Sequence, residues 1–406
     1  MQIYQVGGAV RDELLGFDVK DRDWVVVGAT PEQMTALGYK AVGRDFPVFI
    51  HSETGEEYAL ARTERKTGPG YTGFAFDTSE EVTLEQDLER RDITINAIAR
   101  DGNGNLIDPF NGRKDLEEKI IRHVSAAFVE DPLRVLRAAR FAAQFNFAIA
   151  GETQSLLKEI SATDELETLA PERVWTETEK ALQTAQPRRY FEVLRECAAL
   201  AKLFPEIDRL FGVPQPERHH PEIDSGVHTL MVLEQATAIA GDPEVRFAAL
   251  VHDLGKGTTP QQVLPKHHGH EERGVALINN LCDRLRIPNR YRDLAVLVSR
   301  YHLDCHRINE MKATTVLRKL EGLDAFRRPE RFDRFLLACE ADARGRKGKE
   351  LEDYPQAVLF RKYLDACLAL DTNSTDFLDL EGPQIAERIR MQRTEAIRKV
   401  KQGEAV

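Results

Sequence analysis

Two patterns of hydrophobic and polar positions divide the chain. Up to Lys114, short apolar runs alternate with glycine, proline and aspartate, which predicts an α/β unit. Strands are expected at residues 24–27, 48–50, 58–61 and 93–99. After Lys114, apolar residues recur at helical spacing and β-branched alternation nearly disappears. The pattern predicts an α+β protein, with a mixed sheet and its helices first and an all-helical remainder after it.

The helical remainder is interrupted once. Residues 212–221 contain three prolines and one glycine, which predicts a linker or an extended surface loop. A chain of 406 residues is also too long for one ordinary core. We expect four parts: a head, a helical neck and body, a further functional domain and a helical tail, at residues 1–114, 115–211, 212–350 and 351–406.

Composition places the chain among water-soluble globular proteins. Apolar residues make up 42% and charged residues 30%, and no apolar stretch approaches the roughly 20 residues that cross a bilayer. The N-terminus lacks the pattern of a secretion signal, so we expect a cytoplasmic protein without a membrane partner. The five cysteines are scattered and form no C-x-x-C pair, which favours reduced, mostly buried thiols over disulfides or structural zinc.

Charge is distributed unevenly. The net charge of −11 argues against a nucleic-acid partner for the surface as a whole, because phosphate contacts need lysine and arginine. Arginine-rich stretches nevertheless occur at residues 62–66, 134–140 and 388–401. We therefore expect a concentrated polyanion site.

Phosphate chemistry is suggested at two points of the head. Gly7 and Gly8 stand between an apolar strand and a helical pattern, where bare backbone N–H groups can bind phosphate oxygens; a tight turn that needs glycine is the alternative. Asp21 and Asp23 are two apart at the mouth of a strand, so both carboxylates share one face and can bind the same Mg²⁺ ions. Their alternative is a solvated strand end.

A third carboxylate is predicted at Glu57, which begins what reads as the neighbouring strand. Three carboxylates on adjacent strands would suit two-metal phosphoryl transfer. Since Glu56 lies beside Glu57, an ordinary charged strand flank is the alternative.

Five segments in order resemble the successive motifs of class II tRNA nucleotidyltransferases: GGAVRD, DxD, RRDITINA, DPFNG and EDPLRVLRAARF, at residues 7–12, 21–23, 90–97, 108–112 and 130–141. The resemblance implies a polymerase-β-like head followed by helical neck, body and tail, with Mg²⁺, CTP, ATP and the tRNA 3′ end as cofactor and substrates. Residues 61–66 and 68–71 resemble a flexible segment that the family links to the change from C to A addition.

Asp131 and Arg134 are three apart on a predicted helix and hence on one face. A carboxylate acceptor beside a guanidinium donor can imitate a template base. Cytosine and adenine present an amino donor beside a ring-nitrogen acceptor, whereas uracil and guanine present a carbonyl to the carboxylate. The pair would therefore accept C and A and refuse U and G.

Further arginines continue this spacing. Arg137 and Arg140, with Arg91, resemble the family's triphosphate contacts, a role suited to the guanidinium fork. Gly8 and Arg11 of the first motif join the same predicted nucleotide site, and Asn96 resembles a fixed family position that orients motifs. The alternatives are a solvated helix face for the arginine stripe and a surface rim around Arg91.

A second chemistry is predicted further along. His228, the pair His252 and Asp253, and Asp342 are similar to the ligand set of the HD phosphohydrolase superfamily. Imidazole and carboxylate suit several divalent transition metals, and nickel is one candidate. The similarity also extends to His270 and His302, where the superfamily often adds histidines. The loop residues His219, His220, His267 and His268 are interpreted as surface residues.

An HD domain fused to such a head is typical of the multifunctional CCA proteins of bacteria. That resemblance implies phosphatase, 2′-nucleotidase and 2′,3′-cyclic phosphodiesterase activities beside CCA addition. Three alternatives stay open: a poly(A) polymerase with the same head motifs, an enzyme that adds only C or only A, and an HD domain that serves only for tRNA docking or dimerisation. A homodimer is a further candidate assembly of the chain.

Overall fold

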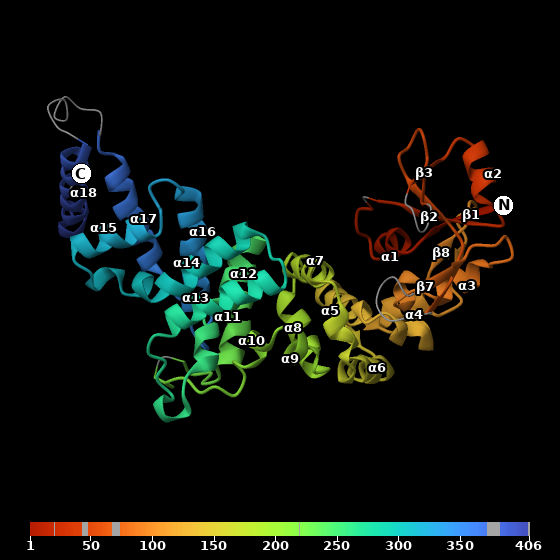
Figure 1. Cartoon of the computed structure of the whole chain (residues 1–406), viewed down its shortest axis with the longest axis horizontal. Coiled ribbons are helices and arrows are strands. Elements are labelled where there is room, and N and C mark those ends of the chain that lie inside the picture. The colour runs from red at the N-terminus through yellow and green to blue at the C-terminus, as the bar shows by residue number, and fades with distance from the viewer. Residues whose placement is uncertain (20, 43–47, 67–73, 219, 372–381, 405–406) are drawn as a thin grey trace. The chain divides into compact units, whose positions relative to one another are not determined.

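The computed structural model describes the chain apart from residues 20, 43–47, 67–73, 219, 372–381 and 405–406. The segment 68–71, expected to serve the change from C to A addition, lies outside the described residues, as does His219. The chain forms two compact units, Met1–Leu203 and Phe204–Val406, which are described separately (Figure 1). The predicted order of a mixed-sheet head followed by helices is confirmed.

The head is built on a seven-stranded sheet in the order β3-β4-β5-β2-β1-β8-β9. At its centre, β2 (Asp23–Val27) runs antiparallel to β1 (Gln2–Val6) and parallel to β5 (Glu57–Leu60). Neighbouring residues of a strand face opposite sides. Val25 therefore joins one buried cluster with Val6 and Val26 joins another with Phe49, so both faces of the sheet are covered.

The other elements of the head are short. Four strands complete the sheet: β3 (Lys40–Val42), β4 (Val48–Ile50), β8 (Ala99–Arg100) and β9 (Leu106–Ile107). A separate hairpin consists of β6 (Thr63–Lys66) and β7 (Phe74–Asp77). The helices of this part are α1 (Gly8–Leu14), α2 (Pro31–Ala36), α3 (Leu84–Glu89) and α4 (Gly112–Glu118).

The strand predicted at residues 93–99 is wrong for most of its length. Thr94–Asn96 form a 3₁₀ helix, η1, and only Ala99 enters a strand. Thr94 Oγ1 donates a hydrogen bond to Asp115 Oδ2 at 2.6 Å, and Asn96 Nδ2 donates to Asp92 Oδ1 at 3.0 Å. These buried side-chain hydrogen bonds to distant or local carboxylates outweigh the β propensity of the isoleucines.

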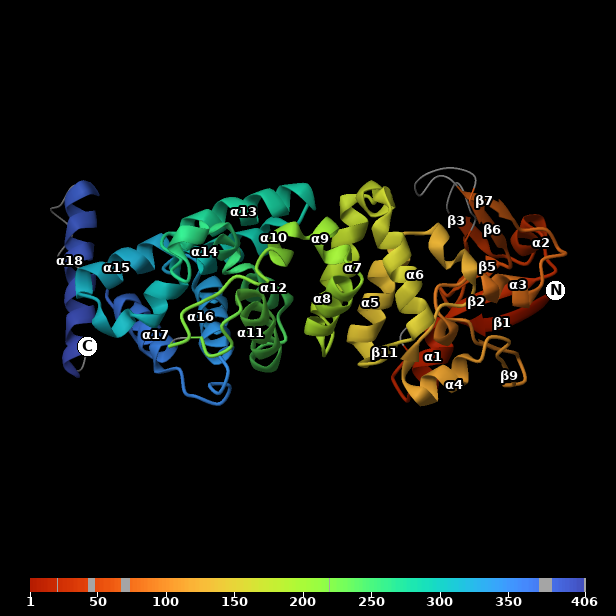
Figure 2. The ribbon, with the colours of Figure 1, turned by 90° about the horizontal axis from the view of Figure 1, so that it is seen from below.

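The helical part of unit 1 surrounds α5 (Leu133–Phe145), which packs against α7 and α8 (Figure 2). Its helices after α5 are α6 (Gly151–Ala162), α7 (Pro171–Leu182), α8 (Pro187–Glu196) and α9 (Ala199–Leu203), with the 3₁₀ helices η2 (Ala126–Glu130) and η3 (Asp164–Thr168). Two short strands, β10 (Ile120–Ile121) and β11 (Ala148–Ile149), pair in parallel within this otherwise helical region.

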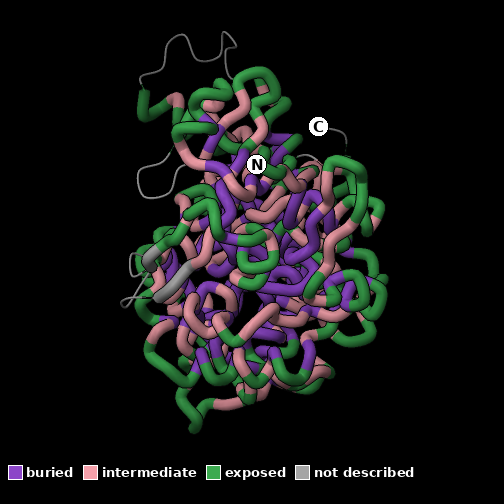
Figure 3. Tube along the Cα trace, turned by 90° about the vertical axis from the view of Figure 1, so that its right-hand side faces the viewer, coloured by how far each residue is buried: buried purple, intermediate pink, exposed green. Residues whose placement is uncertain are grey.

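Unit 2 contains α-helices and 3₁₀ helices among its described residues. The helices α11, α12, α14 and α16 pack on one another. Buried and exposed stretches alternate along the trace of the whole chain (Figure 3). Its elements are α10 (Pro205–Asp208), α11 (Ser225–Ile239), α12 (Pro243–Val251), η4 (Leu254–Thr258), η5 (Gln261–Val263), α13 (His270–Arg284), α14 (Asn289–His306), η6 (Ile308–Glu310), α15 (Ala313–Gly322), α16 (Pro329–Arg344), α17 (Pro355–Leu368) and α18 (Gly382–Gln402).

Three further expectations have structural outcomes. The described residues 212–218 and 220–221 belong to a loop of unit 2 that is held in place, because the buried Lys256 donates to Gln215 Oε1 at 2.5 Å. All five cysteines are free and buried, as predicted. Within the part of the chain that the structure describes, none of the helices is long and apolar enough to cross a membrane.

Candidate active sites

A polar pocket of about 690 Å³ in unit 1 gathers nearly all of the predicted head residues. It collects six arginines, four aspartates, the glycine turn and residues of α5 and α7. The residues lining it are Gly7, Gly8, Arg11, Asp21, Asp23, Arg90, Arg91, Asp92, Asn96, Asp131, Arg134, Arg137, Arg140, Phe141, Gln144 and Lys180. The spatial cluster is therefore the concentrated cationic site that the net charge of the chain conceals.

The predicted carboxylates lie at one end of the sheet. Asp21 and Asp23 both line the pocket. Glu57 is exposed, lies opposite Asp23 in the parallel register of β2 and β5, and is not among the lining residues. The pKa of Asp23 is raised, first by partial removal of its carboxylate from water and also by Asp21, while the charge of Arg91 opposes the shift.

Glycine is required at the turn that enters the pocket. Gly7 has a φ of +69°, which side chains rarely tolerate. A Cβ there would also come within 2.8 Å of Arg91 Nη1. The close approach of the β1–α1 turn to Arg91 therefore depends on Gly7.

Asp92 contacts Arg137 directly and Arg11 through Asn96, a role that the sequence did not indicate. Its buried carboxylate accepts from Arg137 Nε at 2.7 Å and from Asn96 Nδ2 at 3.0 Å. Asn96 Oδ1 in turn accepts from Arg11 Nη1 at 2.5 Å. Burial alone would raise the pKa of Asp92, but Arg137 and these hydrogen bonds outweigh it and lower the pKa to about 2.

Arg140 and Arg91 are likewise held by buried carboxylates. Arg140 Nε donates to Glu177 Oε2 at 2.5 Å, and its guanidinium lies 4.0 Å from the ring centre of Phe141. Arg91 Nη2 donates to Asp87 Oδ2 at 3.2 Å. Glu177 and Asp87 lie outside the motif that supplies Arg140 and Arg91 respectively, so no local spacing indicates them as partners.

The interpretation of Asp131 and Arg134 as one face of a helix is wrong in its geometry. Asp131 is extended and lies before Pro132, while Arg134 belongs to α5. Asp131 Oδ1 accepts from the Leu133 N–H at 3.0 Å, and Arg134 donates to the Ala127 and Arg90 carbonyls. Proline at the start of the helix separates the two residues. Both nevertheless line the same pocket.

A buried cluster in unit 2 brings together all four predicted HD ligands. His228 Nε2 lies 3.2 Å from Asp342 Oδ1, and His252 Nε2 lies 3.0 Å from Asp253 Oδ2 and 3.6 Å from Asp342 Oδ1. Two ligands about 2.05 Å from one tetrahedral ion stand about 3.3 Å apart. The spacing of these donors therefore fits a single divalent metal ion.

A second group shares Asp253. Its Oδ1 lies 3.1 Å from His270 Nε2 and 3.7 Å from His302 Nε2. The buried atoms His252 Nε2 and His270 Nε2 lie 3.0 and 3.1 Å from the oxygens of Asp253, yet neither they nor Asp253 Oδ1 make a hydrogen bond of acceptable geometry. Because unpaired buried polar atoms are costly, their convergence is the observation that best supports metal binding here.

The histidines of the cluster are turned inward by their backbone contacts. The Nδ1 atoms of His252 and His270 lie 2.7 Å from the carbonyls of Ala249 and His267, and Nδ1 of His302 lies 3.0 Å from that of Val298. A proton on each Nδ1 leaves Nε2 as the free donor atom. These backbone contacts thus orient Nε2 of each ring toward the cluster.

Charge favours the ionised carboxylates. Burial opposes ionisation of Asp253 and Asp342, but His252 and further cations hold both pKa values well below their usual range. Lys256 Nζ lies 2.5 Å from Asp253 Oδ2. Both carboxylates are therefore ready to serve as ligands.

The interpretation of the loop histidines as surface residues is wrong for two of them. His267 is buried, with its ring between Thr259 Oγ1 at 2.8 Å and the Pro214 carbonyl at 3.0 Å. His220 is partly buried and lies 3.0 Å from Glu222 Oε1. Loops usually run over the surface, but contacts within unit 2 bury His267 and partly bury His220. His268 is exposed as predicted.

Two positions that the sequence analysis missed lie directly behind the ligands. Glu222 Oε1 is 3.0 Å from His228 Nδ1, and His306 Nε2 is 2.7 Å from Asp342 Oδ2. His306 follows His302 by one helical turn on α14, a spacing that offered a signal. Glu222 stands six positions before His228 in a loop and offered none.

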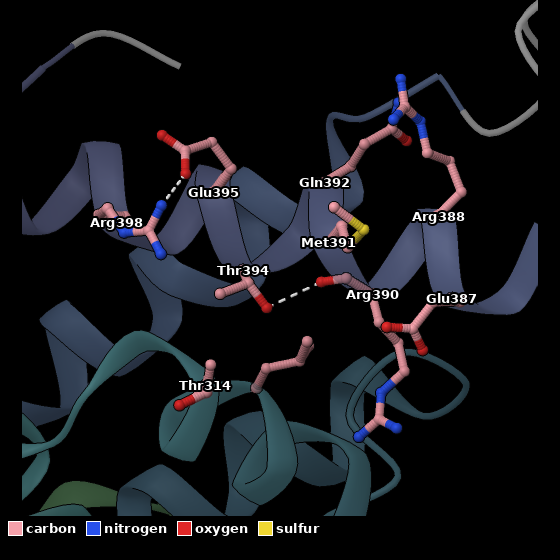
Figure 4. A pocket seen from close by; sticks show the side chains of 10 residues that line it. Thr314, Glu387, Arg388, Arg390, Met391, Gln392, Thr394, Glu395 and Arg398 are labelled. Carbon is pink, nitrogen blue, oxygen red and sulfur yellow. Dashed lines mark hydrogen bonds and ion pairs between the residues drawn. The ribbon is translucent and has the colours of Figure 1, made fainter.

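The third arginine-rich stretch lies on α18. It lines a pocket of about 570 Å³ with Thr314 and Leu317 of α15 (Figure 4). Arg390 Nη2 lies 3.0 Å from Glu321 Oε2, and Arg398 pairs with Glu395. Part of this basic stretch therefore serves local ion pairs.

Three family models match the chain: the poly A polymerase head domain at residues 3–122, a probable RNA-binding and SrmB-binding site of polymerase A at 146–211, and the HD domain at 226–341. Together, the fold, the two sites and these matches define the class of protein: a template-independent nucleotidyltransferase head joined to an HD domain. The multifunctional CCA proteins of Thioalkalivibrio sulfidiphilus and Nitrosococcus oceani are 61% and 58% identical to it, over 99% and 98% of both chains. The chain belongs to the family of multifunctional CCA proteins.

Solved structures share the fold over nearly the whole chain. The CCA-adding enzyme of Bacillus stearothermophilus in complex with CTP is 26% identical, with a TM-score of 0.63, covering 99% of this chain and 89% of that one. The Thermotoga maritima CCA-adding enzyme complexed with tRNA is 21% identical, with a TM-score of 0.64, covering 100% and 88%. A CCA-adding enzyme with ATP reaches a TM-score of 0.66 at 22% identity, covering 98% and 86%.

Proposed function

We propose that unit 1 adds C, C and A to the 3′ end of tRNA and that the HD domain in unit 2 hydrolyses phosphoesters. The observation that carries the first activity is the single pocket that holds Asp21, Asp23, the arginine cluster and Asp131 with Arg134. CTP, ATP and the tRNA 3′ end are the proposed substrates, supported by the relatives crystallised with CTP, ATP and tRNA. Membership of the family argues against a poly(A) polymerase.

Divalent ions are used by both kinds of domain. In the head, Asp21 and Asp23 would hold Mg²⁺, and Glu57 on the adjacent strand would add a third carboxylate. Bound there, Mg²⁺ supplies activation of the attacking hydroxyl and neutralisation of the departing pyrophosphate. The pKa of Asp23 is raised first by desolvation and then by Asp21, so a cation beside it would favour the ionised carboxylate.

The arginines of the pocket would bind the nucleotide. Arg91, Arg137 and Arg140 bind the triphosphate, each oriented by a carboxylate on its other side. Gly8 and Arg11 complete this site at the start of α1. The carboxylates keep the forks rigid, so little side-chain freedom is lost when phosphate binds.

Base selection is the proposed role of Asp131 and Arg134. Arg134 is anchored by its two donations to backbone carbonyls at 2.9 and 2.6 Å, so its guanidinium has a fixed position beside the pocket. The Asp131 carboxylate is fixed by the Leu133 N–H. Fixed acceptor and donor groups can discriminate against bases whose edges do not match them.

In unit 2, His228, His252, Asp253 and Asp342 would hold a divalent transition metal, with Ni²⁺ as the candidate. Bound there, the metal supplies an activated nucleophile for phosphoester hydrolysis. The proposed activities are those of a phosphatase, a 2′-nucleotidase and a 2′,3′-cyclic phosphodiesterase. The unpaired buried donor atoms favour this over a purely docking role for the domain.

We assign residues 1–114 to the nucleotidyltransferase head and residues 115–211 to nucleotide selection and tRNA binding. Residues 212–350 form the proposed hydrolase, and residues 351–406 form the tail. We infer that Arg388 and the other basic residues of α18 contact tRNA phosphates. The cytoplasm is the proposed compartment. A homodimer is the assembly to test first by light scattering.

Incubation of the purified protein with tRNA that lacks its 3′ CCA, with each NTP singly and with all together, tests the transferase. We expect CTP alone to add C residues, and CTP with ATP to complete CCA. Incorporation of UTP or GTP at rates comparable to CTP would contradict the proposal, and a long A tail would identify a poly(A) polymerase.

A further inference from the structure

A small basic pocket lies beside the buried metal-ligand cluster of unit 2. It has a volume of about 210 Å³ and is lined by residues of α14, the end of α16 and the segment that follows, including His306, Arg346, Lys349 and Tyr354. His306 connects it to the cluster: its Nδ1 lies 2.7 Å from the Tyr354 hydroxyl and its Nε2 lies 2.7 Å from Asp342 Oδ2. One side chain therefore separates the pocket from a predicted metal ligand.

The three cations of this pocket differ in their partners. Arg344 Nη2 lies 2.8 Å from Glu340 Oε1, and Lys349 Nζ lies 2.9 Å from Glu352 Oε2. Arg346 has no hydrogen-bonded or ion-paired partner for its guanidinium among the residues that the structure describes, and its Nε is buried without an acceptor. A buried guanidinium N–H without an acceptor is costly unless a ligand supplies one.

The backbone fixes Arg346 in place. The preceding Gly345 packs so closely on α11 that a Cβ there would come within 2.5 Å of Val232 Cγ2. The following Lys347 donates its backbone N–H to Glu222 Oε2 at 3.3 Å. The Arg346 turn is thus held against the helix that carries His228 and against the carboxylate behind that ligand.

We propose that Arg346 binds the phosphate group of the phosphoester that unit 2 hydrolyses, and that this pocket admits the substrate to the buried cluster. The inference rests on the proposed hydrolase function and names the anion site it needs. A guanidinium presents paired donors that match two phosphate oxygens. Glu352 and Asp353 also line the pocket, but the ion pair of Glu352 with Lys349 at 2.9 Å leaves Arg346 as the cation available to an anion.

The test compares the wild-type chain with Arg346→Ala, Arg346→Lys and the neighbouring control Lys347→Ala, whose exposed side chain is outside the pocket. With Ni²⁺ added, hydrolysis of para-nitrophenyl phosphate and of 2′,3′-cyclic AMP is measured over substrate concentration. We expect Arg346→Ala to raise KM for both substrates at least tenfold, Arg346→Lys to raise it less, and Lys347→Ala to leave it unchanged. Bound nickel, measured by atomic absorption, should be equal in all four proteins.

A binding arm separates this inference from the hydrolase proposal. Inorganic phosphate is titrated calorimetrically into the nickel-loaded wild type and each variant, and Arg346→Ala should weaken its binding by the same factor as KM. Unchanged KM and unchanged phosphate affinity in a folded Arg346→Ala protein would overturn the inference. If the wild type binds phosphate through Arg346 but hydrolyses neither ester, the anion site stands and the proposed hydrolase function fails.

Discussion

At the scale of single residues, both sites rely on groups that stand behind the ones facing the pocket. Asp92 orients Arg137, and Glu222 lies against His228 at 3.0 Å. Motif similarity identifies Arg137 and His228 because those residues occupy recognisable spacings. It does not identify Glu222, which comes to His228 only through the fold of a loop.

Glu222→Gln should weaken metal binding in unit 2. The Glu222 carboxylate lies 3.0 Å from His228 Nδ1 and favours a proton on that nitrogen, which leaves Nε2 free to face the cluster. The uncharged amide of glutamine would stabilise that proton less. We expect the affinity for Ni²⁺ to fall about 10-fold to 100-fold, measured by competition with a chromophoric chelator. The exposed Glu217→Gln is the control, and equal affinities of the two variants would remove Glu222 from this role.

Asp131→Ala should relax the choice of nucleotide. Without the acceptor, bases that present a carbonyl are no longer penalised, so the rate with UTP relative to CTP should rise about tenfold or more. Single-nucleotide incorporation into tRNA lacking CCA measures this ratio. Glu130→Gln, one position earlier and outside the pocket lining, should keep the wild-type ratio. A proportional loss of all four nucleotides in Asp131→Ala would instead indicate a general structural role.

At the scale of elements, periodicity located β2, β4 and β5 and the helices after Lys114, since each buries a regular face. Periodicity gives a wrong prediction at residues 93–99, where the apolar run predicts a strand. There the polar residues between the isoleucines form the buried hydrogen bonds that fix η1. It also failed at Asp131, because Pro132 moves the start of α5 past that residue.

The ion pair between Asp92 and Arg137 joins the η1 segment to α5, and its contribution should depend on pH. The pKa of Asp92 is about 2 in the folded chain, below its ordinary value, so the pair stabilises the fold above about pH 4 and loses this effect as pH falls toward 2. Asp92→Asn should therefore lower the unfolding free energy at pH 7 by about 2 kcal/mol, and the difference from wild type should shrink below pH 4.

Urea unfolding followed by tryptophan fluorescence measures this effect in unit 1 alone, because Trp24 and Trp175 are the two tryptophans of the chain. The exposed Asp18→Asn, in the loop between α1 and β2, serves as the control. A difference between Asp92→Asn and wild type that stays constant down to pH 2 would show that the ion pair is not its source.

At the scale of the whole molecule, the sequence predicts the class of each part but not the assembly of the second site. The order of the head motifs indicates the transferase, and the mixed sheet follows from it. His228 and Asp342 are 114 positions apart and meet only because α11 packs on α16. Glu222 contacts both His228 of α11 and the Lys347 N–H after α16, so its role also depends on a packing that no local pattern encodes.

The central claim is that two phosphate chemistries occupy two separate sites in one chain. It is tested most directly by assaying CCA addition and Ni²⁺-dependent hydrolysis of 2′,3′-cyclic AMP in Asp23→Asn and Asp253→Asn side by side. The account predicts that Asp23→Asn loses CCA addition at least a hundredfold and keeps hydrolysis, while Asp253→Asn does the reverse. Loss of both activities in either folded variant, or hydrolysis that survives Asp253→Asn, would contradict it.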